Sequence, residues 1–506
     1  MTTAMFKTGM NRTILNQDFF QTIVDRALSP RTAWTKSWSE EELDSSASIL
    51  SNISSGDDDE DEDYDVDFGP NEHSSSSNSN RATLQTSQSA DEPCPMNDMT
   101  GHFLYRIEYQ QLPKTIHTRY PTSTHSPSSP SSSRTLSIAT TSRPEAAAHT
   151  EEGQLWVVIK SKPIDTALIE LTNIMAQLQG GDIAEEYDQV KDLTGFRNSH
   201  IREIELAELA WQVGGAMERI SAKVYNVLRN DSQQLYALCL EYLNPALGNI
   251  THMNSTETAL STWSADDIHL ALRDLASFHA QFLGQEKRIL EMSFLENPTR
   301  PMMKVLRPTY EAMVKTNHKN DPDLFTQFLS QHMLDYLAHS DEYWATLERS
   351  PRTLIHGDFN TRNICLRLDQ TTGAQQLCAY DWELACCHVP QRDVVELLSF
   401  VLPPGSTEWP HYIEYHRLAL QVSLESQRKH TGSVRHGRVP SSMEYYEVAK
   451  IALMDFASLR VAMYGISNSF KQVDWLPRIL SSVEAQLKRM GPLRSRRDKV
   501  LHESKL

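Results

Sequence analysis

Residues 356–363 read His-Gly-Asp-Phe-Asn-Thr-Arg-Asn, and residues 380–383 read Tyr-Asp-Trp-Glu. Short apolar runs at 353–355 and 377–380 bracket the first segment and lead into the second. This pattern predicts a strand, a polar loop and a second strand, with an acidic residue at the end of that second strand. His, Asp and Asn at this spacing, followed by an Asp at a strand end, are typical of phosphoryl transfer.

The chemistry of phosphoryl transfer gives each of these residue types a role. The reaction needs a base near the acceptor hydroxyl, and it needs oxygen ligands that hold Mg²⁺ on the nucleotide phosphates. Asp358 is the candidate base. Asn363 offers a neutral carbonyl oxygen to the metal, and Asp381 offers an anionic one. We expect His356 to orient the loop by hydrogen bonding.

The two segments resemble the aminoglycoside phosphotransferase and choline kinase family. That family carries HGDxxxxN and a DxE or DWE pair, where protein kinases carry HRDxxxxN and DFG, and Gly357 and Glu383 follow the first pattern. The resemblance covers roughly residues 101–490. It implies an α+β, bilobal, protein-kinase-like fold with a small antiparallel-sheet N-lobe and a larger, mainly helical C-lobe. It also implies ATP and Mg²⁺ as cofactors and a small-molecule hydroxyl as acceptor.

Further residues match the family's nucleotide site one at a time. Lys160, at the end of a predicted strand, matches the lysine that holds the nucleotide phosphates. The helix from residue 198 should supply its carboxylate partner, with Glu203 as first choice and Glu205 as second. Residues two apart on a helix do not share a face, so only one of them is expected to pair with the lysine. Backbone groups of Glu241 and Leu243 resemble the hinge that binds the adenine edge.

Other positions have two interpretations. Asp393, at the start of a predicted helix, either braces the catalytic loop or caps its own helix. Trp382 and Trp475 either line the acceptor pocket or lie in the core, and His279 is expected to be a core histidine. A phosphate-binding loop favours glycine because the backbone must approach the ligand closely. Only Gly101 precedes the strand predicted near residue 102.

This shortage of glycine keeps two alternatives to a small-molecule kinase open. One is a catalytically inactive kinase-fold protein that binds a metabolite or serves as a scaffold. The other is a protein kinase, which Gly357 disfavours because protein kinases carry Arg at this position.

The pattern of composition along the chain predicts one bilobal catalytic unit with long additions. The 39% share of hydrophobic residues is low for a globular chain, where about 45–50% is usual. The predicted order is an N-terminal helical segment at 1–44, a disordered acidic and Ser-rich insertion at 45–100, an N-lobe at 101–243 with a disordered insertion at 114–150, a C-lobe at 244–490 and a tail at 491–506.

The net charge of −18 over 506 residues excludes some classes of function. Nine of the 66 acidic residues lie at 57–67, so half of the negative excess belongs to one short run. A general nucleic-acid binder would carry a basic surface, which this composition does not predict. No stretch approaches about 18 consecutive apolar residues, so no membrane span is predicted.

The last three residues, Ser504, Lys505 and Leu506, form the tripeptide that a soluble peroxisomal import receptor reads. They predict a peroxisomal location, with the cytoplasm as the alternative. Fusing a tag after Leu506 is therefore expected to leave the protein cytosolic, because the receptor requires a free end. Fluorescence microscopy checks this, and an unchanged punctate distribution would refute the targeting prediction.

Overall fold

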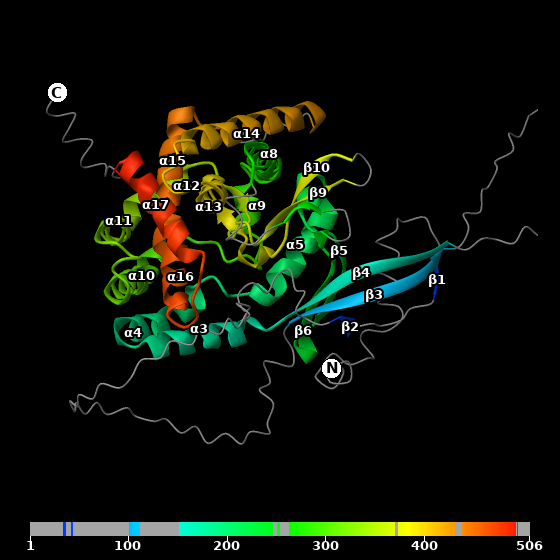
Figure 1. Ribbon diagram of the computed structural model, residues 1–506, viewed down its shortest axis with the longest axis horizontal. Helices are drawn as coiled ribbons and strands as arrows, with labels where there is room; N and C mark the ends of the chain where they lie inside the picture. Colours follow the sequence, from blue (N-terminus) through cyan, green and yellow to red (C-terminus); the bar gives the residue numbers. More distant parts are fainter. Residues whose placement is uncertain are drawn as a thin grey trace, which may run out of the picture.

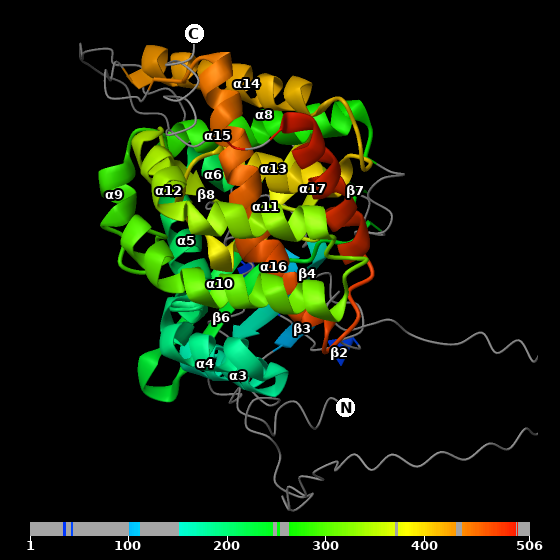
Figure 2. The same ribbon diagram turned by 90° about the vertical axis from the view of Figure 1, so that its left-hand side faces the viewer.

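Two lobes of different composition make up the part of the chain that the computed structural model describes (Figure 1). That part comprises the strands at 34–36, 42–43 and 101–111 and the residues 151–245, 250–253, 263–369, 373–431, 438–491 and 493. A twisted antiparallel sheet forms the smaller lobe, and helices dominate the larger one (Figures 1 and 2). The expected bilobal α+β fold is confirmed.

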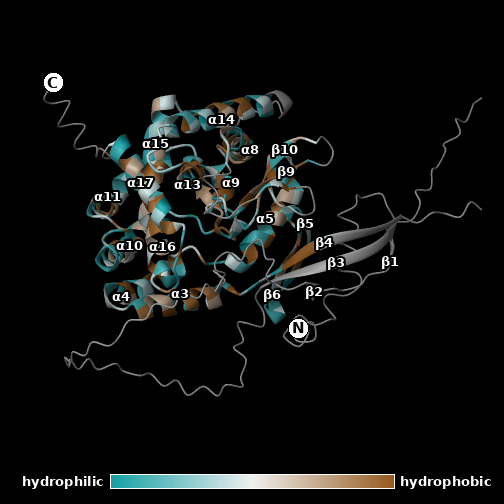
Figure 3. Cartoon of the chain, in the orientation of Figure 1, coloured by the Kyte–Doolittle hydropathy of each residue, from teal (hydrophilic) through white to brown (hydrophobic). Residues whose placement is uncertain are grey.

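The sheet of the N-lobe has the strand order β1-β3-β4-β6-β5, with β2 paired to β3. Neighbouring strands run antiparallel, and β3 pairs with β4 from Gly101 opposite Ser161 to Gln111 opposite Glu151. The central strands β4 and β6 are apolar and buried where they face each other, which Figure 3 shows as brown on β4. The strands are β1 (Trp34–Lys36), β2 (Glu42–Leu43), β3 (Gly101–Gln111), β4 (Glu151–Lys162), β5 (Val224–Asn230) and β6 (Leu235–Glu241).

The N-terminal segment 1–44 departs from the helical prediction where the structure describes it. Residues 34–36 and 42–43 are strands that pair with β3, so they belong to the N-lobe sheet. The physical reason is the unpaired edge of β3, whose backbone groups gain partners from these residues. The rest of segment 1–44, both predicted insertions and the end of the tail lie outside the described residues.

Four helices follow β4 before the chain returns to the sheet: α3 (Asp165–Gln179), α4 (Gly181–Val190), α5 (Ser199–Val213) and α6 (Gly215–Ile220). The helix predicted from residue 198 is confirmed as α5, and the stretch 166–179, whose pattern also predicts a helix, lies in α3. Helix α4 was not predicted. It packs on α10 of the other lobe, and both views show α3 and α4 beneath that helix (Figures 1 and 2).

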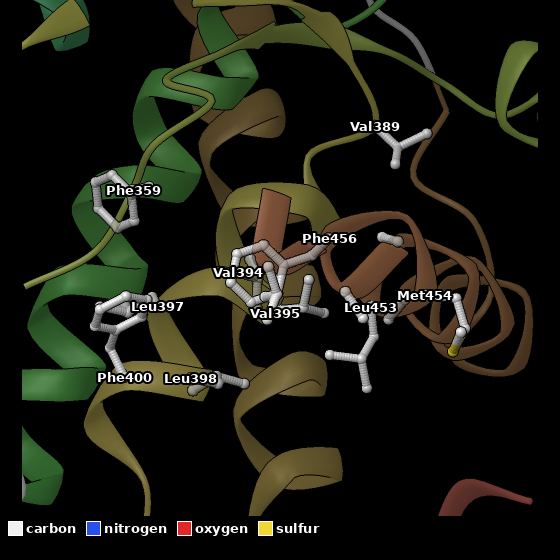
Figure 4. Packing of buried hydrophobic residues seen from close by; sticks show 14 of the residues in the cluster. Phe359, Val389, Val394, Val395, Leu397, Leu398, Phe400, Leu453, Met454 and Phe456 are labelled. Atoms are coloured by element: carbon white, nitrogen blue, oxygen red, sulfur yellow. The ribbon is translucent and has the colours of Figure 1, made fainter. Parts of the chain in front are cut away.

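The C-lobe is built around α13 (Gln391–Val401), in which every residue is buried. Figure 4 shows its apolar side chains packed between Phe359, which lies in the catalytic loop (residues 356–363), and Leu453 and Phe456 of the C-terminal helices. The surrounding helices are α8 (Ala265–Phe282), α9 (Glu286–Leu290), α10 (Arg300–Asn320), α11 (Gln327–Ala338), α12 (Ser340–Arg349), α14 (Trp409–Thr431), α15 (Ser442–Asp455), α16 (Ala462–Asn468) and α17 (Leu476–Met490). No helix in the described part of the chain is long and apolar enough to cross a membrane.

Short strands between these helices position the two motif segments. The catalytic loop joins β8 (Thr353–Ile355) to β9 (Ile364–Leu368). Strand β10 (Gln375–Ala379) leads into the Asp-Trp-Glu sequence at 381–383, which is called the acidic segment below, and then into β11 (Cys386–His388). Strand β9 lies between β10 and β7 (Ile250–His252), and β8 pairs with β11. The predicted strand, loop and strand are confirmed, and β10 and β9 pair in register from Ala379 opposite Ile364.

Candidate active site

Asp393 holds the catalytic loop from the first turn of α13. Its Oδ2 atom accepts the backbone N–H of His356 at 2.8 Å, and its Oδ1 atom accepts that of Gly357 at 3.0 Å. His279 of α8 approaches Oδ2 through Nε2 at 3.2 Å. Burial would raise the pKa of Asp393, but the hydrogen bond and positive potential of His279 hold it below its usual range. The side chain therefore braces the loop, and His279 is a core histidine with a defined partner.

His356 orients the loop from a fully buried position. Its Nε2 atom lies 2.9 Å from the carbonyl oxygen of Tyr380, and its Nδ1 atom lies 3.3 Å from the backbone N–H of Asp358. These partners are satisfied together when Nε2 carries the proton and Nδ1 accepts. The ring thus ties the catalytic loop to the end of β10, immediately before the acidic segment.

Five side chains surround the carboxylate of Asp358. Asn363 Nδ2 donates to its Oδ2 atom at 2.8 Å. Its Oδ1 atom accepts from Asn360 Nδ2 at 3.1 Å and from the hydroxyl of Tyr464 at 3.0 Å. Two arginines lie near the same oxygen, Arg460 at 3.0 Å and Arg362 at 3.8 Å. The carboxylate is therefore held in one orientation.

These arginines keep Asp358 ionised. Burial alone would raise the pKa of Asp358, but Arg460 and Arg362 outweigh burial and hold it well below its usual range. Opposite charges within about 4–6 Å favour the charged form in this way. The group is therefore an anion at any pH near neutrality and is ready to accept a hydrogen bond from a hydroxyl.

Lys160 forms the ion pair expected with Glu203. Its Nζ atom lies 2.9 Å from Glu203 Oε2 and 2.7 Å from Asp381 Oδ1. Burial would lower the pKa of Lys160, but Asp381 and Glu203 raise it above its ordinary value. Glu205, the second choice, lies on another face of α5 and pairs with Arg229 at 2.7 Å.

A second lysine with ion pairs in this site, Lys162, was not predicted. Lys162 lies two residues after Lys160 on β4, so both side chains emerge on the same face of the sheet. Its Nζ atom lies 3.1 Å from Glu203 Oε2 and 2.5 Å from Glu383 Oε2. Two lysines on alternate strand positions and two acids in the Asp-Trp-Glu segment were the available signal. The sequence interpretation used only one of each.

Asn363 and Asp381 have the donor chemistry that a magnesium ion requires. Asn363 Nδ2 donates to Asp358, which leaves its carbonyl oxygen as the atom that would meet a metal. Lys160 occupies Asp381 Oδ1, so Oδ2 is the corresponding atom there. Burial opposes ionisation of Asp381, yet Lys160 and Lys162 hold its pKa at about 2. Mg²⁺ is commonly held by one or two protein groups plus substrate phosphates and water, and this pair fits.

The hinge residues lie between the sheet and the small strands of the C-lobe. Leu243 is buried in a cluster with Ala222, Ile250 and Cys365. Glu241 ends β6, and its backbone N–H donates to the carbonyl of Lys223 at 2.9 Å. Its carboxylate forms an ion pair with Arg367 of β9 and accepts from the backbone N–H of Lys223 at 2.7 Å. Thus the Glu241 side chain joins the lobes, and adenine binding by the backbone stays a prediction.

The segment that carries most of these residues matches a known protein family. Residues 202–420 match the model of the phosphotransferase enzyme family, whose short name is APH. The family resemblance is thereby confirmed. The matched phosphotransferase segment begins in α5 beside Glu203 and contains the hinge, the catalytic loop and Asp381. A search of curated proteins finds no match.

Solved structures that match this chain include an ethanolamine kinase, an aminoglycoside phosphotransferase and a choline kinase. An ethanolamine kinase from Plasmodium vivax has 12% identity and a TM-score of 0.37, with 65% of this chain and 76% of that chain covered. The GDP complex of aminoglycoside 2'-phosphotransferase-IIIa has 14% identity and a TM-score of 0.33, with coverages of 58% and 83%. A choline kinase from Streptococcus pneumoniae has 12% identity and a TM-score of 0.32, with coverages of 66% and 86%.

The glycine of the phosphotransferase motif has a steric role. Gly357 has φ of +81°, and a Cβ atom built on it would overlap the backbone carbonyl oxygen of Leu384. The catalytic loop and the acidic segment therefore touch backbone to backbone at this residue. Asp381 itself has φ of +64°, a conformation that Asp adopts more readily than most residues.

Replacing Gly357 by alanine is expected to displace the catalytic loop from the acidic segment. We expect turnover to fall by about a hundredfold, since an ångström of misplacement at an active site can cost this much. Gly405→Ala is the matched control, because Gly405 has φ of +79° and no atom near a built Cβ. Both variants bear the left-handed backbone cost of roughly 1–2 kcal/mol. Equal turnover and equal Tm in the two variants would contradict the steric role.

A cavity of about 350 Å³ opens beside Asp358, and its lining comes from residues inside and outside the matched segment 202–420. Asn363, Asp381 and Glu383 line one end. Trp475 lines it too, whereas Trp382 packs in the core with its indole N–H donating to the carbonyl of Ala379 at 3.3 Å. One of the two candidate tryptophans therefore faces this space.

Three functional residues escaped sequence interpretation because they lie far from the motifs in the chain. Arg202 of α5 donates to the carbonyl of Glu383 at 2.6 Å and so fixes the acidic segment. Arg460 and Tyr464 reach Asp358 from the C-terminal helices. Arg460 lies in a π-helical turn at 456–461, a feature frequent at functional sites. For Arg460, the only signal in the sequence was a charged residue within a mostly apolar helical run.

Proposed function

We propose that this protein transfers the γ-phosphoryl group of ATP, in a Mg²⁺-dependent reaction, to a hydroxyl group of a small molecule. The observation that carries the proposal is the placement of Asp358, which lies in the wall of the same cavity as Asn363 and Asp381. A base, two oxygen ligands and a space for an acceptor thus meet in one site. The family match over residues 202–420 supports a phosphotransferase.

In this mechanism Asp358 would orient the attacking hydroxyl and accept its proton as the new oxygen–phosphorus bond forms. The bond between the γ-phosphorus and the bridging oxygen breaks in the same step, and ADP leaves with that oxygen. A base of low pKa suffices because the transition state is loose and the hydroxyl loses its proton late. Asn363 and Tyr464 keep the carboxylate in place, and Arg460 compensates its charge. Mg²⁺-bound ATP supplies the phosphoryl group and a metal that offsets its negative charge.

The ion pairs at the end of β4 position the nucleotide side of the site. Glu203 lies within 3.1 Å of both lysine ammonium groups and holds them beside the acidic segment. Lys160 is then placed to meet nucleotide phosphates, while Asp381 and Asn363 meet the metal. The backbone at Glu241 and Leu243 is the proposed adenine contact.

Untargeted phosphorylation with purified protein tests the proposal. The protein is incubated with Mg²⁺, labelled ATP and a panel of small alcohols, and labelled products are sought by mass. We expect at least one alcohol to gain a phosphate, and none to do so when EDTA removes the metal. Labelling of generic protein substrates alone would favour a protein kinase. Binding of Mg-ATP without any transfer or hydrolysis would favour the inactive scaffold.

A further inference from the structure

The wall of the active-site cavity is apolar away from the catalytic residues. Leu168, Met175 and Ala176 come from α3, and Ile183 and Tyr187 come from α4. On the opposite side the C-lobe contributes apolar residues of α10, α16 and the segment before α17, namely Met313, Met463, Ile466 and Val473. The helices inserted between β4 and α5 therefore close the acceptor side of the site with hydrocarbon.

The carboxylates that line this cavity all have cationic partners within the chain. Asp358 faces Arg460 at 3.0 Å. Asp381 lies 2.7 Å from Lys160, and Glu383 lies 2.5 Å from Lys162. Arg460 and one further cation, Arg362, belong to the lining itself. No unpaired carboxylate among the described lining residues is available to an incoming ammonium group.

The aromatic faces nearest Asp358 are also occupied. The guanidinium carbon of Arg362 lies 4.6 Å from the ring centre of Trp475 and 5.5 Å from that of Tyr464. Arg460 lies 5.1 Å from the centre of the Tyr464 ring. A quaternary ammonium group binds proteins mainly through such faces or through carboxylates. Here Arg362 and Arg460 already contact the faces of Trp475 and Tyr464. The carboxylates of the lining are paired with Arg460, Lys160 and Lys162.

We infer that the acceptor is an alcohol with an apolar, non-cationic body, and that α3 and α4 bind this body. The inference rests on the proposed function and specifies the substrate class of the same site. Burying hydrocarbon against α3 and α4 is favourable in proportion to the area removed from water. Burying an ammonium group beside two arginines, without a free carboxylate, is strongly unfavourable. The site therefore discriminates by charge as well as by shape.

A matched pair of alcohols tests the inference. Choline and 3,3-dimethylbutan-1-ol have nearly the same shape and differ in the positive charge of the quaternary centre. Binding of each to the full-length protein is measured by calorimetry, with and without Mg²⁺ and a non-hydrolysable ATP analogue. We expect the neutral alcohol to bind at least tenfold more tightly. Equal affinity, tighter binding of choline, or binding of neither alcohol would overturn the inference.

A charge placed in the cavity should reverse this preference. Met175→Glu puts a carboxylate into the lining from α3, and we expect the ratio of affinities to shift at least tenfold toward choline. Leu178→Glu is the control, because Leu178 lies on the same helix, is 71% exposed and does not line the cavity. An unchanged ratio in folded Met175→Glu protein, or an equal shift in the control, would place the alcohol elsewhere.

The binding readout separates this inference from the proposed function. If the neutral alcohol binds and Met175→Glu shifts the preference, but no alcohol is phosphorylated, then the proposed reaction fails and the assignment of the cavity stands. If alcohols are phosphorylated but ammonium alcohols bind and react best, then the proposed reaction stands and the assigned substrate class is wrong.

Discussion

Replacing Asp358 by asparagine is expected to lower turnover by about 10²–10⁴-fold, the usual contribution of a general base. Asparagine keeps the shape of the side chain but cannot accept the proton of the acceptor hydroxyl. We expect Mg-ATP to bind the variant as it binds the wild type, because the metal ligands Asn363 and Asp381 are unchanged. Steady-state kinetics with the best acceptor of the panel, together with a thermal-shift titration of Mg-ATP, measures both effects.

The same variant has a predictable dependence of stability on pH. The pKa of Asp358 in the folded protein lies below its ordinary value of 3.8, so its ionised form stabilises the fold above that pH. This contribution is lost as the pH falls toward the lowered pKa. The difference in unfolding free energy between wild type and Asp358→Asn is therefore expected near pH 7 and should shrink below about pH 4.

A surface aspartate provides the control for Asp358→Asn. Asp341 is paired with Arg300 on the surface of the C-lobe, and it does not line the active-site cavity. Asp341→Asn makes the same chemical change next to an arginine and should leave turnover unchanged. Turnover of Asp358→Asn within tenfold of the wild type, in folded protein, would remove Asp358 as the base.

Asp381→Asn is expected to abolish measurable turnover, with a loss of at least about 10³-fold, because it removes the proposed anionic ligand of the metal. It also removes the partner of Lys160 at 2.7 Å. The backbone should tolerate the change, since residue 381 has φ of +64° and asparagine adopts this conformation readily. The substitution therefore tests the charge and leaves the local geometry in place.

Mg-ATP binding distinguishes the two aspartates. We expect Asp381→Asn to require a higher Mg²⁺ concentration for binding and to lose most of the thermal shift that Mg-ATP gives the wild type. Asp358→Asn should keep that shift. An Asp381→Asn variant with the wild-type dependence on Mg²⁺ would exclude this residue as a metal ligand, whatever its turnover.

Residues close together in the chain allowed much of the site to be predicted. The catalytic loop and Asp381 are flanked by strands that a short apolar pattern predicts, and their chemistry limits their roles. The resemblance to the phosphotransferase family selected Lys160 at the end of a predicted strand and Glu203 on a predicted helix, and their ion pair is present at 2.9 Å. The functional roles of these residues stay predictions until the variants are measured.

Other parts of the fold were not predictable, because strand pairing and helix packing with distant segments overrode weak local sequence patterns. The acidic residues before Leu43 predicted a helix, but Glu42 and Leu43 pair with β3. Helix α4 begins at Gly181, where no helix was predicted, and it packs against α10. Local propensity differs by only about 1 kcal/mol per residue between alternatives, so long-range contacts decide such segments.

The sequence by itself predicted the chemistry: a candidate carboxylate base, two candidate oxygen ligands for a metal and a lysine with its glutamate partner. These groups lie in segments whose local spacing restricts where they can point. Only the tertiary structure decided the surroundings of that chemistry, because they come from residues distant in the chain. Arg460 and Tyr464 lie about a hundred positions after Asp358, and they meet it because the C-terminal helices bury their apolar faces against α13. That packing sets the charge and the apolar wall of the cavity, and with them the acceptor that the site is proposed to select.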